Sequence, residues 1–130
     1  MALTIHPKAG MVVVCDFAGY KEPEIIKIRP VVIISPNHLP RYGLCTVVPL
    51  STTAPSPVQP YHYKLIGSPF PHDPSDVWAK CDLVASVSVD RLDRIRISRG
   101  NYNVFYVSME QVRKIRICAA ISLGVDVNTE

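Results

Sequence analysis

Two apolar segments carry, at one end, side chains that could hold a phosphate or a carboxylate. Arg29 opens the segment 30–34, and the segment 46–50 is followed by three hydroxyl residues: Ser51, Thr52 and Thr53. A guanidinium is a planar and permanently charged donor that suits anionic oxygens, and hydroxyls donate and accept hydrogen bonds beside it. If the two segments are strands that pair, we expect these groups to share one anion site.

The elements that must position these side chains are mostly short strands. β-branched residues dominate the apolar segments, and the proline-rich segment 54–75 is expected to form loops with one edge strand. The patterns predict strands over seven ranges: 11–17, 25–35, 44–50, 61–66, 77–89, 94–97 and 104–106.

The hydrophobic period changes near the end of the sequence. Ser108 with Gln111 three residues later is a capping-box pattern, Val112, Ile115 and Ala119 recur at helical spacing, and Gly124 is a natural stop. We therefore predict a mainly β fold, a small barrel with a C-terminal amphipathic α-helix.

Length and composition favour one domain over residues 1–130. The apolar runs are too short to cross a bilayer, and the cysteines lie in apolar segments without the spacing of a zinc site or a disulfide scaffold: Cys15, Cys45, Cys81 and Cys118. These features predict buried free thiols in a soluble, cytoplasmic protein with no membrane contact.

The net charge is only +3, but seven of the fourteen basic residues fall between Arg91 and Arg116. Such local density suits a polyanion or an acidic protein partner. On charge alone, a solvated face with scattered ion pairs explains it equally well.

Several kinds of chemistry lack their usual signatures in this sequence. It contains no Walker-type phosphate loop, no Gly-x-Ser-x-Gly elbow, no His-Glu-x-x-His helix and no paired cysteine motif. What remains is acid–base chemistry without a metal or other cofactor. RNA is the simplest target, because its 2′-hydroxyl is a built-in nucleophile that needs only a base, an acid and a cation.

Four segments in order resemble one family. They are Val12-Val13-Val14-Cys15-Asp16-Phe17 after Gly10, Lys27-Ile28-Arg29-Pro30-Val31-Val32-Ile33-Ile34-Ser35-Pro36, Thr46-Val47-Val48-Pro49-Leu50-Ser51, and Cys81-Asp82-Leu83-Val84 leading to Ser88-Val89-Asp90-Arg91-Leu92. This pattern is similar to the PemK/MazF toxins of bacterial type II toxin–antitoxin systems over roughly residues 10–124.

The resemblance implies an SH3-like barrel of the CcdB/MazF/PemK type and a homodimeric endoribonuclease, an mRNA interferase. Such an enzyme cuts single-stranded mRNA at short sequences without a metal and leaves 2′,3′-cyclic phosphate and 5′-hydroxyl ends. It further implies a cognate antitoxin with an acidic C-terminal segment, and contact with DNA only indirectly through the antitoxin complex.

Carried over by position, the resemblance makes Arg29 the catalytic arginine and places Ser51 at the catalytic threonine position, with Thr52 and Thr53 beside it as RNA-binding residues. Lys80 falls where some members have a catalytic arginine, and Asp82 matches an acidic residue assigned as general base. Strand alternation predicts that Lys80 and Asp82 point into the same groove.

The sequence also departs from the family pattern. The loop between the first two strands carries two carboxylates, Glu22 and Glu24, and either could be the RNA-binding loop carboxylate. Compared with the threonine of the family, Ser51 keeps the hydroxyl and lacks the methyl group. Compared with arginine, Lys80 keeps the positive charge and lacks the planar group that donates two parallel hydrogen bonds. His62, between Tyr61 and Tyr63, is a further candidate for RNA binding or a reserve base.

Two other functions compete with the ribonuclease. The same barrel serves CcdB-type toxins that bind gyrase and cut nothing, and a barrel that binds RNA without turnover is a third possibility. Each site residue also has a simpler explanation: Arg29 as a surface ion pair with Glu22, Glu24 or Asp82, and Ser51 as part of a polar turn.

Overall fold

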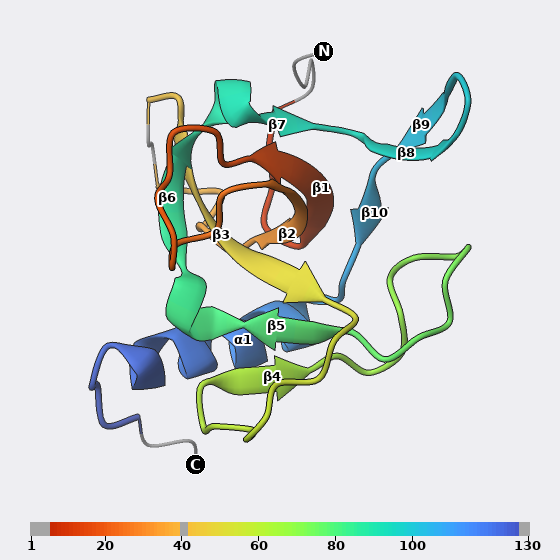
Figure 1. Ribbon diagram of the computed structural model, residues 1–130. Coiled ribbons are helices and arrows are strands. Elements are labelled where there is room, and N and C mark those ends of the chain that lie inside the picture. Colours follow the sequence, from red (N-terminus) through yellow and green to blue (C-terminus); the bar gives the residue numbers. More distant parts are fainter. Residues whose placement is uncertain (1–5, 40–41, 128–130) are drawn as a thin grey trace.

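Ten strands, two short 3-10 helices and one α-helix follow one another in the computed structural model, which describes residues 6–39 and 42–127 (Figure 1). The strands are β1 (Met11–Asp16), β2 (Ile28–Ile33), β3 (Leu44–Ser51), β4 (His62–Lys64), β5 (Trp78–Lys80), β6 (Ala85–Ser88), β7 (Leu92–Asp93), β8 (Ile95–Ser98), β9 (Asn101–Asn103) and β10 (Phe105–Tyr106). The helices are η1 (Cys81–Leu83), η2 (Val89–Arg91) and α1 (Met109–Ser122).

Eight of these strands form one antiparallel sheet built around β1, β2 and β3. Its path runs β10-β1-β2-β3-β5-β4, while β6 pairs with β3 and β7 pairs with β1. The path ends in β10 and β4, so the bent sheet does not close into a full barrel. The remaining strands, β8 and β9, form a hairpin of their own that projects from one side of the molecule (Figure 1).

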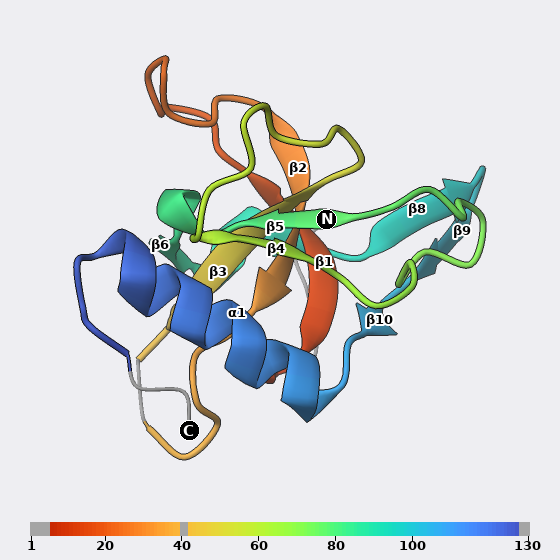
Figure 2. The ribbon, with the colours of Figure 1, turned by 90° about the horizontal axis from the view of Figure 1, so that it is seen from below.

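Both faces of the central strands are buried, which is why they read as continuous apolar runs. Along β1, Val12 packs in a cluster that includes residues of helix α1. Its neighbour Val13 packs in a second cluster, which is formed mainly by residues of β1, β2 and β3. Figure 2 shows α1 lying across one face of the sheet. The predicted mainly β fold with a C-terminal helix is confirmed.

Helix α1 begins and ends where the sequence indicates. Ser108 Oγ accepts a hydrogen bond from the Gln111 backbone N–H at 3.2 Å, and Val112, Ile115 and Ala119 are buried. Gln111 does not complete the capping box, because its side-chain oxygen instead accepts the Ile66 N–H at 2.7 Å. The helix is therefore tied to the loop after β4 as well as to the core.

The predicted strand over 77–89 is wrong in its middle. The chain runs beside β3 as β5 and β6, but η1 interrupts it at Cys81–Leu83. The range 94–106 also differs from the prediction, since β9 was not expected there. The prediction of a single domain over 1–130 includes residues outside the described ranges and stays a prediction.

The thiols lie in the core or beside it. Cys15, Cys45 and Cys81 are buried and Cys118 is half-buried, and none forms a disulfide, as predicted for these residues. Burial raises the pKa of the Cys15 thiol to about 11 and also raises those of Cys81 and Cys118. Thiols in such surroundings stay protonated at neutral pH and are poor nucleophiles.

Gly10 is required by the packing before β1. Its φ is +91°, and a Cβ at this position would lie 2.9 Å from the Val107 carbonyl oxygen. We expect Gly10→Ala to destabilise the protein by about 2 kcal/mol, because it adds a backbone clash to an unfavourable φ. Urea denaturation measures the change. Gly67→Ala is the control: φ is +77° there but nothing lies within 4 Å, so we expect a cost of about 1 kcal/mol. Equal costs for the two variants would contradict this explanation.

Candidate active site

One cavity of about 530 Å³ collects most of the side chains that the sequence singles out. Arg29 at the start of β2, Ser51 at the end of β3 and Lys80 at the end of β5 all line it, together with Thr52 and Thr53. The sheet order explains the convergence, since β3 lies between β2 and β5. The rest of the wall is mainly apolar: Ile25, Pro30, Pro49, Leu50, Phe70 and Leu83.

Arg29 is exposed, and among residues 6–39 and 42–127 no carboxylate forms an ion pair with it. Its backbone is held by pairing with Cys15 of β1. The simpler explanation of Arg29 as an ion-paired surface residue therefore finds no support in the described part of the chain. An exposed guanidinium without an ion-pair partner can bind an anion such as a phosphate.

Ser51 is fixed by the loop that it begins. Its Oγ accepts the Thr53 backbone N–H at 3.0 Å, and the hydroxyl lies 3.5 Å from the Thr53 carbonyl oxygen. The second distance is long for an O–H···O hydrogen bond. The hydroxyl is thus oriented by a short turn, and its proton makes only a long contact within the described part of the protein.

Asp82 lies beside this cavity rather than in it. Strand β5 ends at Lys80 and Asp82 belongs to η1, so the expectation that both side chains share one strand face is wrong. Asp82 lines a second cavity of about 240 Å³, and Ile25 and Leu83 belong to the walls of both cavities. The helical turn moves the carboxylate sideways by breaking the period-two alternation.

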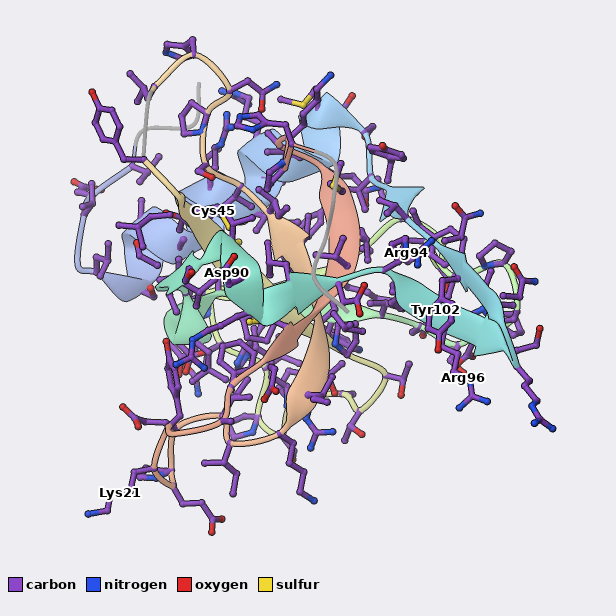
Figure 3. The ribbon with its side chains drawn as sticks, turned by 90° about the horizontal axis from the view of Figure 1, so that it is seen from above. Lys21, Cys45, Asp90, Arg94, Arg96 and Tyr102 are labelled. Atoms are coloured by element: carbon purple, nitrogen blue, oxygen red, sulfur yellow. The ribbon has the colours of Figure 1, made fainter. Side chains whose placement is uncertain are left out.

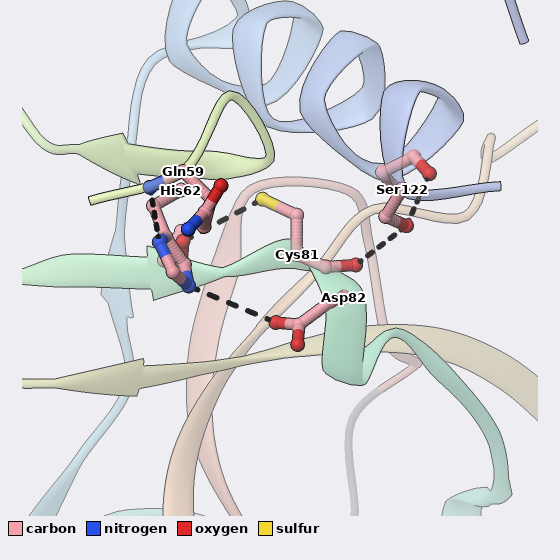
Figure 4. A network of polar contacts seen from close by, with 7 residues as sticks. Gln59, His62, Cys81, Asp82 and Ser122 are labelled. Carbon is pink, nitrogen blue, oxygen red and sulfur yellow. Dashed lines mark hydrogen bonds and ion pairs between the residues drawn. The ribbon is translucent and has the colours of Figure 1, made fainter. Parts of the chain in front are cut away.

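His62 faces Asp82 with a defined ring nitrogen (Figure 4). Its Nδ1 accepts the Gln59 backbone N–H at 3.0 Å, which places the ring hydrogen on Nε2. Nε2 lies 4.0 Å from Asp82 Oδ1. The side chain is only 9% exposed, so little of the ring is open for stacking on a base. Direct RNA contact by His62 stays an untested prediction.

Helix α1 packs against η1, the turn that carries Asp82. Ser122 Oγ donates its proton to the Ala119 carbonyl oxygen at 2.6 Å and lies 3.4 Å from the carbonyl oxygen of Cys81, which is long for an O–H···O hydrogen bond (Figure 4). The Cys81 thiol is directed at the Ala79 carbonyl oxygen. The Asp82 side chain, 40% exposed, therefore projects from a turn that is packed on the helix.

The loop carboxylates differ in their placement. Glu24 lines the second cavity with Asp82, and its Oε1 accepts the Lys21 backbone N–H at 2.6 Å. Glu22 is exposed and lines neither cavity. Of the two alternatives, the structure brings only Glu24 to the neighbourhood of the site.

Sequence reasoning missed the aromatic part of the wall. Phe70 lies in the proline-rich segment, and its ring centroid is 6.4 Å from that of Phe105. His72 lies 6.1 Å from Phe70 and 6.4 Å from Phe105 between ring centroids. No local signal identifies this group, because its members come from a loop and from β10.

Across residues 6–39 and 42–127, no group of three or more His, Cys, Asp or Glu side chains is arranged to hold a metal ion. Within the same ranges, no helix has both the length and the apolar character needed to cross a membrane.

Comparison with known proteins places these features in a family. A family profile described as PemK-like, MazF-like toxin of type II toxin–antitoxin system matches residues 8–122. Among curated proteins, the uncharacterized protein YifN of Escherichia coli (strain K12) is 33% identical over 125 residues, which cover 79% of this chain and 83% of YifN.

Solved structures share the fold. An endoribonuclease from a mycobacterial species is 24% identical with a TM-score of 0.63, covering 94% of this chain and 95% of its own. MazF from Deinococcus radiodurans is 20% identical with a TM-score of 0.64, covering 92% of this chain and 97% of its own. The likeness confirms the predicted fold type.

Proposed function

Because the chain belongs to the PemK-like, MazF-like toxins of type II toxin–antitoxin systems, we propose that it is a metal-independent endoribonuclease that cuts single-stranded mRNA at specific sequences. The observation that carries this proposal is the cavity in which a guanidinium, an ammonium and hydroxyls gather beside a carboxylate. Cleavage of mRNA would inhibit translation and growth.

In the proposed reaction, the ribose 2′-oxygen attacks the adjacent phosphorus and the bond from phosphorus to the 5′-oxygen breaks. The products are a 2′,3′-cyclic phosphate and a 5′-hydroxyl. Arg29 holds the scissile phosphate and stabilises the charge that grows on its oxygens, and Ser51 donates a hydrogen bond to one of them. Thr52 and Thr53 line the same cavity and contact the RNA backbone.

Asp82 takes the 2′-proton or orients the group that does, and Lys80 donates a proton to the leaving 5′-oxygen or adds positive charge. We assign His62 as a positioning residue. Its Nε2–H is directed at the Asp82 carboxylate and its Nδ1 is held by the Gln59 N–H, so the ring can orient the carboxylate without itself reaching RNA. Glu24 lines the second cavity together with Asp82, whereas Glu22 lines neither cavity.

The partners follow from the same proposal. We propose a homodimer in the cytoplasm, inhibited by a cognate antitoxin whose acidic C-terminal segment covers the cationic cavity and competes with RNA. DNA is contacted only through the antitoxin complex.

The test is cleavage of a mixed-sequence RNA in the presence of EDTA, with chemical analysis of the new ends. We expect cyclic phosphate and 5′-hydroxyl ends, since the proposed groups supply base, acid and cation without a metal. Intact RNA would overturn the proposal. A gyrase supercoiling assay would then test the CcdB-like alternative, and RNA binding without cleavage would indicate a barrel that has lost turnover.

A further inference from the structure

The hairpin β8–β9 lies in the chain between β7 and β10, two short strands that both pair with β1. Asp93 pairs with Val14 and Phe105 pairs with Val12, so the chain leaves the β1 ladder after Asp93 and rejoins it at Phe105. In the described part of the chain, β8 and β9 pair only with each other. Figures 1 and 2 both show the hairpin projecting beyond the main sheet.

The two faces of the hairpin differ in character. Ile95 is buried in the core, whereas Arg96 is exposed and lies opposite Tyr102 in the β8–β9 ladder. The guanidinium carbon of Arg94 lies 5.3 Å from the centre of the Tyr102 ring. Figure 3 shows Arg94, Arg96 and Tyr102 together on the hairpin. Arg99 is exposed at the turn, and we call these four residues the hairpin surface.

The hairpin surface is rich in positive charge. Residues 94–109 contain three arginines and no aspartate or glutamate, and the flanking carboxylates are Asp93 and Glu110. Other basic residues of the same region have structural partners instead: Arg91 donates to the carbonyl oxygens of Asp16 and Ala18 at 2.8 and 2.9 Å, and Arg116 donates to that of Ile34 at 2.8 Å. The basic segment therefore contains two arginines that hold the fold, three arginines on or beside the hairpin, and two exposed cations on α1, Arg113 and Lys114.

An aromatic group joins the hairpin to the cavity. Phe70 lines the cavity, and Phe105 follows the hairpin in β10. The ring centroid of the exposed His72 lies 6.1 Å from that of Phe70 and 6.4 Å from that of Phe105. The loop that carries Phe70 and the hairpin also project on the same side of the molecule in Figures 1 and 2. Phe70 is buried and Phe105 is half-buried, so this group connects the wall of the cavity with the strand that follows the hairpin through packing, and His72 is its exposed member.

We propose, on the basis of the nuclease function above, that the hairpin surface holds the single-stranded RNA that flanks the scissile phosphate. Arg96 and Arg99 contact backbone phosphates, and Tyr102, 39% exposed and held by Arg94, offers its ring to a base. Cations beside an exposed aromatic ring are typical of single-strand nucleic-acid sites. An acidic peptide would use the cations but has no need of the ring or of continuity with the cavity.

The test measures binding to fluorescent, mixed-sequence RNAs of about four and about twelve nucleotides, which bracket a pocket-sized and an extended site. The RNAs carry 2′-O-methyl groups, so the proposed nucleophile is blocked. The variants are Arg96→Gln with Arg99→Gln, which removes two cations, and Tyr102→Leu, which removes the ring. The control, Arg113→Gln with Lys114→Gln, removes two exposed cations from α1.

We expect the double arginine variant to bind the longer RNA about tenfold more weakly, and its slope of log affinity against log salt to fall by about 1.4. Tyr102→Leu should weaken binding about tenfold with little change in slope, since stacking releases no counterions. The control should bind like the wild type. Thermal unfolding checks that each variant is folded.

The outcomes separate this inference from the nuclease proposal. Wild-type cleavage of RNA together with hairpin variants that bind like the control would overturn the hairpin inference alone. Loss of RNA affinity in the hairpin variants of a protein that cuts nothing would leave the RNA contact standing and remove the nuclease. Loss of affinity for a poly-glutamate peptide with unchanged RNA affinity would assign the surface to an acidic protein and overturn the inference.

Discussion

Replacing Arg29 with alanine is expected to lower RNA cleavage by about a thousandfold, the upper range for losing one pre-oriented donor to a developing negative charge. Arg29 lines the cavity beside Ser51 and has no ion-pair partner among the described residues, so its loss leaves no charge uncompensated in the fold. The measurement is the single-turnover rate on one RNA at saturating enzyme, with urea denaturation run in parallel.

Two further variants make the Arg29 result specific. Arg29→Lys keeps the charge but not the planar fork, so we expect it to recover only part of the rate. Arg113→Ala removes an exposed arginine from α1 and should cleave at the wild-type rate with unchanged stability. Full activity in a folded Arg29→Ala protein would remove Arg29 from the mechanism.

Changing Asp82 to asparagine is expected to lower the cleavage rate by about two to three orders of magnitude, because the shape is retained while the proton acceptor is lost. The η1 turn packs against α1 and the Asp82 side chain is 40% exposed, so the fold should be unaffected. Asp90→Asn, at an exposed carboxylate after β6, is the matched control and should keep the wild-type rate.

The pair with His62 distinguishes positioning from a purely structural role. If His62 acts by orienting Asp82, His62→Gln should cost about tenfold in rate, and the same change should cost almost nothing once Asp82 is asparagine. Equal costs of His62→Gln in both backgrounds would show that His62 acts independently of Asp82. A wild-type rate for Asp82→Asn would remove the carboxylate from the reaction.

Elements whose signals are local could be predicted from the amino-acid sequence. Continuous runs of β-branched residues predicted β1, β2 and β3, and Ser108 and Gly124 set the limits of the helix, because strand propensity and helix caps depend on near neighbours. Arg29 and Ser51 could be placed together from the sequence only on the condition that their two strands pair, which β2 and β3 do.

Features that depend on segments far apart in the chain could not be predicted in this way. No local pattern distinguishes a strand over 77–89 from two strands broken by η1, and that break moves Asp82 out of line with Lys80 and toward His62. The placement of Glu24 at the wall of the second cavity and the projection of the β8–β9 hairpin also depend on distant segments. Helix α1 packs against η1 and β1 packs against β8, and such contacts are formed only when the whole chain has folded.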